Sequence, residues 1–551
     1  MTDQWDEAVD LIVAGTGVAA LATAVTAADA GLKVLMLEST DRWGGSSSMS
    51  GGGLWLPNNP LMKRDGVADS REEALAYLEE TVGDAGPATS RKRKEAFVDG
   101  IGGFVELAER HGVQFARSTD YPDYYPELPG GKIGRAIEVE PFDVRRIGDW
   151  WQTSRGNGSG VPAPVKTDDF WLLSRAWSTP GGFTRGARVV FRTLGTALRG
   201  KKAVGMGSAV TAALMEVALR LGVQVRLSSP VTELVVSEGR VTGVRTTKDG
   251  QTTAIRAERG VMLAGGGFDH NAEWRERYQG VDGADSSGSR GNVGTAIEVA
   301  REIGAAVDLM DDAWWGGSIP PVTPEGSAAF LVSERSMPFT IIVDGAGERF
   351  ANESESYVDL GHHMLEHSKS VPGSYWMVSD ARHARRYLRS YALDPRANKA
   401  MAEAGIMVKA PTLADLALRI GVDPARLAAT VERFNGFARS GIDADFARGN
   451  SAYDRYYGDP LVRPNPNLGP LEKGPFEAVR VVPGDLGTKG GLVTDENARV
   501  LREDGSVIDG LYAAGNNSAS VMGRTYPGPG STLGPASVFG HLAGLHAAGK
   551  L

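Results

Sequence analysis

Short apolar runs separated by glycine-rich turns mark both ends of the chain. Asp10–Ala14 has the pattern of a buried strand, an Ala- and Leu-rich stretch to about Ala30 predicts a helix, and Lys33–Leu37 predicts a second strand. Two later apolar runs, at 261–267 and 510–517, end in glycine or asparagine. A strand, a helix and a strand in this order are typical of a βαβ unit and therefore of a parallel sheet.

The first turn carries residue types that bind a dinucleotide. Gly15 permits a tight turn, Gly17 lets the backbone approach a pyrophosphate, and Ala20 takes the third small position of the pattern. The start of the following helix attracts phosphate charge. Glu38 ends the second strand, where a carboxylate can accept hydrogen bonds from ribose hydroxyls.

Cofactor-binding segments at both ends of the chain imply that a second domain is inserted between them. We expect residues 1–316 and 482–551 to form one domain and 317–481 to form the other. The middle contains a strand-like run, Phe339–Val343, and helical spacing of Leu, Ala and Phe over 413–440. The sequence thus predicts an α/β protein, with a Rossmann-like domain that carries an inserted α+β domain.

Composition narrows the possible functions. The chain has 551 residues and no cysteine, which excludes disulfides, thiolate zinc sites, cysteine-held iron–sulfur clusters and a cysteine nucleophile. The net charge of −9 gives no support for a nucleic-acid partner. There is no run of 18 apolar residues and no secretory signal, so we expect a cytoplasmic protein, either free or peripheral on the inner face of the membrane.

A second glycine- and serine-rich stretch follows the acid and favours FAD over NAD. Trp43–Ser48 and Ser50–Gly53 resemble flavoproteins of the succinate dehydrogenase/fumarate reductase superfamily. In these proteins, backbone amides and small hydroxyls of this stretch wrap the cofactor. Residues 44–53 contain no His, so we expect FAD to bind without a covalent bond. The resemblance implies FAD contacts, besides those of the first turn, at Gly44, Gly45, Ser46, Ser50, Gly51, Gly52, Gly53, Val231, Ala264, Gly265, Gly515, Asn516 and Leu533.

Three tyrosine segments complete a more specific resemblance. They are Asp123-Tyr124-Tyr125, Asn352-Glu353-Ser354 with Tyr357, and Tyr526-Pro-Gly-Pro-Gly530. With them, nearly the whole chain resembles bacterial 3-ketosteroid Δ1-dehydrogenases, which remove hydrogens from carbons 1 and 2 of a 3-keto steroid.

The resemblance implies a role for each of these residues. Tyr357 takes the carbon-2 proton, and Tyr124 assists it. The Tyr526 hydroxyl and the Gly530 amide hold the carbon-3 oxygen. FAD accepts the hydride, and a quinone-like acceptor reoxidises it.

These roles agree with elementary chemistry. A proton next to a ketone becomes acidic only if the oxygen is polarised, and a hydroxyl with an N–H at a helix start can supply that field. We expect Gly530 to lie where a helix begins at Ser531. A free tyrosine has a pKa of about 10, so we expect Tyr124 to lower the pKa of Tyr357 by donating a hydrogen bond to its phenolate.

Two motifs suggest other chemistry. His363 and His367 have the spacing of a metal pair, but the HExxH pattern and an evident third ligand are missing, so we expect no metal site. Lys489 lies between glycines without the spacing of a P-loop, and we expect a structural role near the flavin.

A basic segment lies within an insertion at about 127–203. Residues 184–202 contain six Lys or Arg and no acid. Basic residues on an apolar background suit an anionic membrane surface. A solvated helix or an oligomer contact explains the same pattern equally well.

Three other functions remain open at this point. A ketosteroid dehydrogenase acting at carbons 4 and 5 is the nearest, although Tyr124 and the Tyr526–Gly530 spacing favour carbons 1 and 2. A fumarate reductase-like enzyme needs converging Arg and His, whereas the candidate site offers tyrosines. A non-enzymatic flavin carrier on the membrane would bind FAD without being reduced by steroid.

Overall fold

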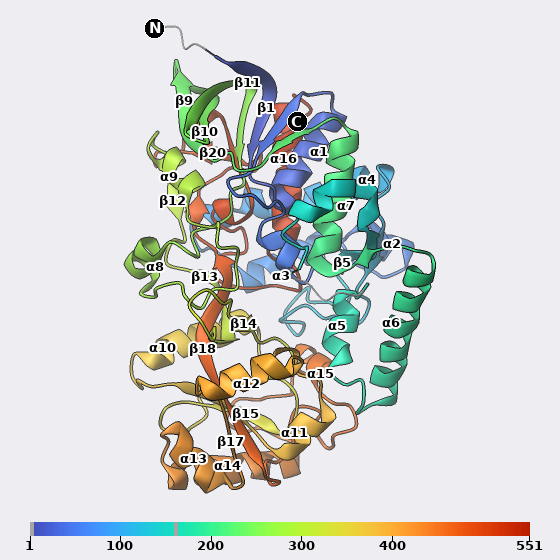
Figure 1. Ribbon diagram of the computed structural model, residues 1–551, viewed down its shortest axis with the longest axis vertical. Coiled ribbons are helices and arrows are strands. Elements are labelled where there is room, and N and C mark those ends of the chain that lie inside the picture. Colours follow the sequence, from blue (N-terminus) through green and yellow to red (C-terminus); the bar gives the residue numbers. More distant parts are fainter. Residues whose placement is uncertain (1–4, 159–163) are drawn as a thin grey trace.

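The computed structural model describes residues 5–158 and 164–551, and it places two lobes one above the other (Figure 1). The described ends of the chain both lie in the upper lobe. Residues 159–163, within the predicted insertion, lie outside the described residues.

The upper lobe is built on a mostly parallel sheet. Its strands run in the order β20-β21-β11-β1-β2-β8, and all neighbours in this order except β20 and β21 are parallel. The apolar runs that predicted strands are these strands, and the residues in the middle of the sheet are buried. The strands are β1 (Glu7–Ala14), β2 (Val34–Leu37), β8 (Gln224–Arg226), β11 (Gln251–Leu263), β20 (Arg499–Leu501) and β21 (Val507–Ala513).

Helices α1 (Val18–Asp29), α7 (Met206–Arg220) and α16 (Leu533–Ala547) share one hydrophobic core with α4 (Arg91–Arg110). Helices α1 and α16 approach closely because small residues line their contact. A Cβ atom on Gly540 would lie 2.4 Å from the Ala19 carbonyl oxygen. This packing fixes the start of α1 at the carboxyl end of β1, where a parallel sheet binds its ligands.

Two further clusters of buried apolar residues, separate from those of the upper lobe, support the lower lobe. Its sheet is antiparallel, in the order β14-β13-β18-β16-β15, with β17 also paired to β18. Helices surround it, so the lobe is α+β and the predicted fold class is confirmed. The strands are β13 (Ala313–Ile319), β14 (Ala329–Phe330), β15 (Thr340–Val343), β16 (Tyr375–Ser379), β17 (Met407–Ala410) and β18 (Phe476–Thr488). The helices are α10 (Tyr357–Ser368), α11 (Ala381–Arg386), α12 (Pro395–Glu403), α13 (Leu413–Ile420), α14 (Pro424–Ser440) and α15 (Ala452–Tyr457).

The helical pattern over 413–440 forms two helices rather than one. Gly421 ends α13 in the left-handed conformation, with φ 75°. Asp423 then caps α14, whose first residue is a proline. Both are ordinary signals for the end and the start of a helix.

Two paired strands connect the lobes. Strand β13 begins at Ala313, before the expected domain boundary near 317. Strand β18 ends at Thr488, after the expected domain boundary near 481. They pair antiparallel from Ala313 with Thr488 to Ser318 with Val482. The proposed boundaries therefore fall inside these two strands, and the division into domains stays a prediction.

The basic segment forms most of helix α6 (Pro180–Leu198), which stands at the right edge of the molecule (Figure 1). Within residues 5–158 and 164–551, no helix has the length and apolar character needed to cross a membrane.

Shorter elements complete the fold: α2 (Pro60–Arg64), α3 (Arg71–Thr81), α5 (Thr167–Leu173), α8 (Ala272–Gln279), α9 (Thr295–Arg301), β3 (Leu54–Trp55), β4 (Phe115–Arg117), β5 (Ala136–Val139), β6 (Phe142–Asp143), β7 (Ala203–Val204), β9 (Val231–Ser237), β10 (Arg240–Lys248), β12 (Val307–Asp308) and β19 (Gly491–Leu492).

Candidate active site

A cavity of about 960 Å³ lies where the two lobes meet, and residues of both lobes line it. Two proposed cofactor contacts lie outside the lining. Ala20 is fully buried in α1, where it packs in the core. The Gly44 N–H donates to the Thr16 hydroxyl, so this glycine shapes the loop. The other proposed residues line the cavity: Gly15, Gly17, Glu38, Gly45, Ser46, Ser50, Gly51, Gly52, Gly53, Tyr124, Val231, Ala264, Gly265, Tyr357, Gly515, Asn516, Tyr526, Gly530 and Leu533.

At one end of the cavity, the first turn forms a cradle of backbone. Gly15 has φ +106°, and a Cβ atom there would lie 2.3 Å from the Ala264 carbonyl oxygen, so only glycine fits. The Glu38 carboxylate is held in place by the Thr16 hydroxyl at 2.5 Å and by the N–H and hydroxyl of Thr40 at 3.0 and 2.9 Å. A pyrophosphate and a ribose fit these groups.

Serine hydroxyls beside this turn are arranged as donors. The Ser46 oxygen accepts from the Ser289 N–H at 2.9 Å and from the Asn292 amide at 3.0 Å, which leaves its hydrogen for a ligand in the cavity. The Ser47 oxygen accepts from Val18 N–H at the start of α1. Sequence reasoning missed Ser47 as a contact, although it stands in the same serine run. Donors of this kind suit the anionic and polar parts of FAD.

At the other end of the cavity, three buried tyrosines meet from segments that are far apart in the sequence. Ring centroids lie 4.7 Å apart for Tyr357 and Tyr526, 5.1 Å for Tyr124 and Tyr526, and 5.4 Å for Tyr124 and Tyr357. Phe330 packs edge-on against Tyr357 at 5.1 Å. This end of the cavity is therefore an aromatic pocket with phenol hydroxyls.

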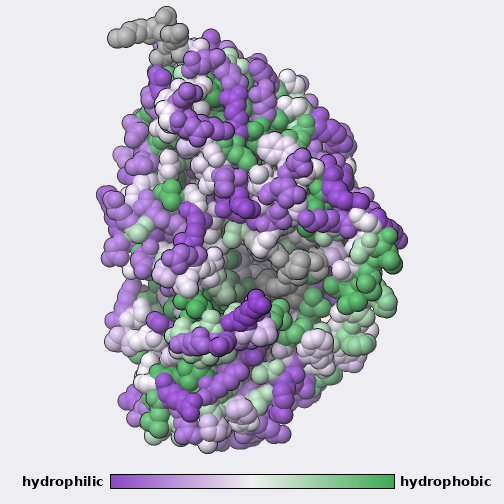
Figure 2. Space-filling model, in the orientation of Figure 1, coloured by the Kyte–Doolittle hydropathy of each residue, from purple (hydrophilic) through white to green (hydrophobic). Residues whose placement is uncertain are grey.

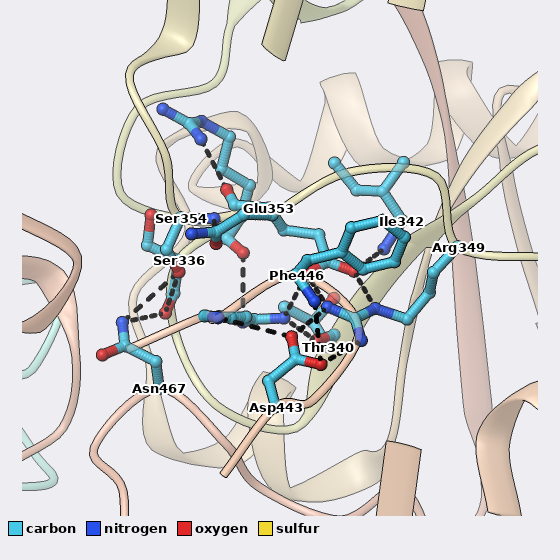
Figure 3. Close-up of polar contacts among 12 residues, drawn as sticks. Ser336, Thr340, Ile342, Arg349, Glu353, Ser354, Asp443, Phe446 and Asn467 are labelled. Carbon is cyan, nitrogen blue, oxygen red and sulfur yellow. Dashed lines mark hydrogen bonds and ion pairs between the residues drawn. The ribbon is translucent and has the colours of Figure 1, made fainter. Parts of the chain in front are cut away.

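Tyr357 is the first residue of α10, and shortly before it Glu353 lies in a buried ionic network (Figure 3). Both oxygens of the Glu353 carboxylate are paired, one with Arg349 at 2.7 Å and the other with Arg448 at 3.0 Å. Arg349 also binds Asp443 at 2.8 Å, so the network pairs two cations with two anions. The charges are out of water and each has an opposite charge beside it, which fixes the turn before Tyr357.

The backbone of Gly530, beside the tyrosines, packs closely against that of Gly53. Its φ is +99°, and a Cβ atom would lie 2.2 Å from the Gly53 carbonyl oxygen. The expectation that a helix begins at Ser531 is wrong, because α16 begins at Leu533. The Ser531 N–H instead donates to the Gly528 carbonyl, closing a turn that keeps the Gly530 backbone beside Tyr526.

The pKa of Tyr357 differs from expectation. Burial raises it well above its usual value near 10, and the neighbouring Tyr124 and Tyr526 raise it further. The predicted lowering of this pKa by Tyr124 is therefore not found, because burial penalises the phenolate and Tyr124 adds to the rise. Burial also raises the pKa of Tyr526, although hydrogen bonds with Tyr357, Thr532 and the Gly530 backbone oppose that rise.

A second group of tyrosines, which sequence reasoning missed, backs the first. Tyr453 of α15 lies 4.2 Å from Tyr124 between ring centroids, and the hydroxyls of Tyr457 and Tyr121 are hydrogen-bonded. The signal was present: Tyr453-Asp-Arg-Tyr456-Tyr457 repeats the spacing of Tyr121-Pro-Asp-Tyr124-Tyr125.

The two histidines with the spacing of a metal pair and the lysine between glycines each bind a different acidic residue. His363 binds Glu355 at 2.8 Å, and His367 binds Asp344 at 2.9 Å. Lys489 is buried, pairs with Asp312 at 3.3 Å and lies 4.9 Å above the Trp314 ring. Trp314 packs edge-on against Tyr526 at 5.4 Å, which places Lys489 behind the site.

Comparison with known proteins agrees with this geometry. The sequence matches the family described as FAD binding domain over residues 10–533. A 3-oxosteroid 1-dehydrogenase of Mycolicibacterium smegmatis is 43% identical, with 97% of this chain and 96% of that protein covered. A crystal structure of 3-ketosteroid Δ1-dehydrogenase from Sterolibacterium denitrificans with 1,4-androstadiene-3,17-dione has a TM-score of 0.91 and 37% identity, covering 99% of this chain and 100% of that one.

The chain belongs to the 3-ketosteroid Δ1-dehydrogenase family. The recognition from the tyrosine segments is thus confirmed, as are the oxidoreductase class and FAD as the cofactor. A more distant relative, a 4-oxocyclohexanecarboxylate 2-dehydrogenase of Sinomonas cyclohexanicum, is 36% identical over 98% of this chain and 93% of that protein. A relative named for a different oxo substrate therefore matches nearly the whole of this chain.

Proposed function

We propose that this protein catalyses the FAD-dependent 1,2-desaturation of 3-ketosteroids. The observation that carries the proposal is the meeting of Tyr124, Tyr357 and Tyr526 beside Gly530, at the far end of a cavity whose other end suits FAD. FAD bound at the other end would supply the acceptor for the hydride that leaves carbon 1.

The residues of the tyrosine end supply the acid–base chemistry. The Tyr526 hydroxyl and the Gly530 N–H donate hydrogen bonds to the carbon-3 oxygen, which stabilise the negative charge that builds there. Tyr357 takes the proton from carbon 2 as its phenolate, with Tyr124 against its ring. The surrounding aromatic side chains exclude water, so the charge is stabilised in a medium where hydrogen bonds are strong.

The lining favours an uncharged substrate. Of the described residues that line the cavity, the charged ones are Glu38, Arg155 and Lys202. Glu38 and Arg155 both bind Thr40, at the cofactor end. Phe330, by contrast, lies against Tyr357. A dicarboxylate, or a ring ketone bearing a carboxylate, needs a cation near the tyrosines, so a fumarate reductase-like activity fits less well.

Anaerobic mixing with a steroid tests the proposal directly. The holoenzyme is mixed with 5α-androstane-3,17-dione while flavin absorbance and product identity are followed. We expect the flavin to be bleached and the double bond to form between carbons 1 and 2. A double bond between carbons 4 and 5 would show the alternative regiochemistry, and an unbleached flavin would show a carrier. 4-Oxocyclohexanecarboxylate serves as the competing substrate and should react far more slowly.

A quinone-like acceptor for the reduced flavin is part of the proposal. Its support is the resemblance to the superfamily described above. We expect menadione to reoxidise the reduced enzyme faster than dioxygen does at equal concentration. Faster reoxidation by dioxygen would argue for an oxidase.

We further propose that helix α6 attaches the protein to an anionic membrane. Two of the six basic residues, Arg185 and Arg192, pair with Asp169 of α5 and so contribute less than expected. The support comes from the apolar side chains of the same helix, since Phe191 is 72% exposed and Leu198 89%. Figure 2 shows apolar side chains gathered at the right edge, where α6 lies. An exposed apolar face flanked by cations suits a lipid interface.

Sedimentation with anionic vesicles tests the attachment. One variant changes Phe191, Leu194 and Leu198 to Gln, and a matched variant changes Arg188, Arg199 and Lys201 to Gln. We expect the first to lose binding and the second to bind more weakly, since each basic residue contributes about 1 kcal/mol. Both should keep steroid turnover. A wild-type protein that stays in the supernatant would contradict the proposal.

A further inference from the structure

The two loops that carry Tyr124 and Tyr526 meet at one backbone atom. The Pro527 carbonyl oxygen accepts a hydrogen bond from the Tyr124 N–H at 2.9 Å. The same oxygen accepts from the hydroxyl of Tyr77 at 2.6 Å. The Tyr77 hydroxyl in turn accepts from the N–H of Tyr125 at 3.2 Å. The Tyr77 hydroxyl therefore contacts both loops. Its partners, Pro527 and Tyr125, each directly follow a proposed catalytic tyrosine.

Tyr77 itself is held rigidly. It lies on α3 and is fully buried, with its ring 5.9 Å from that of Trp55 and beneath the guanidinium of Arg135. Arg135 binds Asp123 at 2.9 Å, and the Trp55 indole donates to the other Asp123 oxygen at 2.7 Å. Both neighbours of Tyr77 are thus bound to Asp123, in the loop that carries Tyr124. Burial holds its pKa well above the usual range, so the hydroxyl stays protonated and keeps donating.

We propose that Tyr77 is a positioning residue, whose hydroxyl sets the spacing between Tyr124 and the Tyr526–Gly530 turn. It is absent from the cavity lining, so it acts through its neighbours. Small misplacements of a donor at a developing oxyanion are costly, because a hydrogen bond weakens steeply with distance and angle. This inference rests on the proposed desaturation.

Replacing Tyr77 by Phe removes only the oxygen atom. A matched control is Tyr375→Phe, since the hydroxyl of this other buried tyrosine donates to the Met364 carbonyl at 2.7 Å. Both variants lose one buried hydroxyl–carbonyl bond, and Tyr77→Phe also loses the bond from the Tyr125 N–H. A merely structural role predicts a lower melting temperature for both variants, with the larger fall for Tyr77→Phe, and an unchanged rate of flavin reduction. The positioning role predicts a catalytic defect only at Tyr77.

The measurement is anaerobic flavin reduction at saturating androst-4-ene-3,17-dione, for holoenzymes of equal FAD content. We expect Tyr77→Phe to lower the reduction rate about tenfold, with less than a twofold change in steroid affinity, and Tyr375→Phe to keep the wild-type rate. Equal rates in the two variants would overturn the inference. So would a Tyr77→Phe protein that fails to retain FAD while Tyr375→Phe retains it, since the hydroxyl would then be structural.

A second readout does not depend on turnover. The carbonyl stretching frequency of bound 1,4-androstadiene-3,17-dione, labelled with carbon-13 at carbon 3, reports how strongly the oxygen is polarised. We expect a higher frequency in Tyr77→Phe than in the wild type, and no change in Tyr375→Phe. An unchanged frequency in both would overturn the inference. Absence of desaturation by the wild type would instead overturn the proposed function.

Discussion

The two ends of the cavity are built by different means. The cofactor end consists mostly of backbone and small hydroxyls, among them the Gly15 turn and the Ser46 hydroxyl. The tyrosine end consists of large side chains from three distant segments. A site made of backbone should tolerate loss of a hydroxyl but not addition of a Cβ atom. A site made of phenols should be sensitive to the loss of a single hydroxyl.

The largest effect should come from Tyr357→Phe. Removal of the base should slow flavin reduction by at least about 10³-fold. FAD should stay bound, because the residues of the cofactor end are untouched. Stopped-flow absorbance at saturating steroid gives the rate, and normal turnover in a fully flavin-loaded variant would exclude Tyr357 as the base.

Tyr526→Phe should come next. Loss of one hydrogen-bond donor to a developing oxyanion costs about 3 kcal/mol, or about 10²–10³-fold in rate. The Gly530 N–H remains, so some activity should persist. Steroid affinity and the reduction rate are measured separately. An unchanged rate with unchanged affinity would remove Tyr526 from the oxyanion site.

Gly15→Ala should weaken FAD binding at the cofactor end of the cavity. Its Cβ atom would meet the Ala264 carbonyl, and strain of this kind should weaken FAD binding by about 10–100-fold. Gly31→Ala is the matched control: Gly31 also has a positive φ, +92°, but no atom lies within 4 Å of the added carbon. Fluorescence titration of the apoproteins with FAD measures both. Equal losses would point to backbone strain rather than to the clash.

The pH dependence tests the raised pKa of Tyr357. The active form is the phenolate, so the reduction rate should rise with pH, about tenfold per unit below the pKa. Because burial raises that pKa above 10, no plateau should appear below about pH 9. Steroid binding should stay constant, since the ketone does not ionise. A plateau near neutral pH would show that bound ligands lower the pKa.

Ser46→Ala should have the smallest effect. Its hydroxyl supplies one hydrogen bond among many, which is worth about 0.5–1.5 kcal/mol, or roughly a few-fold to tenfold in FAD affinity. Catalysis by the loaded enzyme should be unchanged. A loss larger than that of Gly15→Ala would contradict the contrast between backbone and side-chain recognition.

Sequence reasoning succeeded where the physics is local. The strands at Glu7–Ala14 and Val34–Leu37 and the helix between them follow from hydrophobic spacing and glycine placement. The helix break at Gly421 was missed, although its glycine and the following Asp-Pro are local signals. The residues at which a helix ends and the next one begins are the features that a hydrophobic pattern predicts least reliably.

The tyrosine end could not be derived from local patterns. Tyr124, Tyr357 and Tyr526 are separated by more than a hundred residues each, and only the resemblance to a family linked them. Tyr77 gave no signal at all, because a tyrosine on an amphipathic helix is usually an ordinary core residue. The pairing of Arg185 and Arg192 with Asp169 likewise depends on how α5 and α6 pack.

The antiparallel ribbon of β13 and β18 limits how the enzyme can open. Apart from one irregularity between Ala313 and Trp315, its paired residues run from one lobe into the other, so a sharp hinge at this crossing would break the ladder. A two-stranded ribbon can twist far more readily than it can fold over. Steroid entry and exit should therefore depend on small torsional motions of the lobes and on movement of surface segments, rather than on wide separation of the two halves.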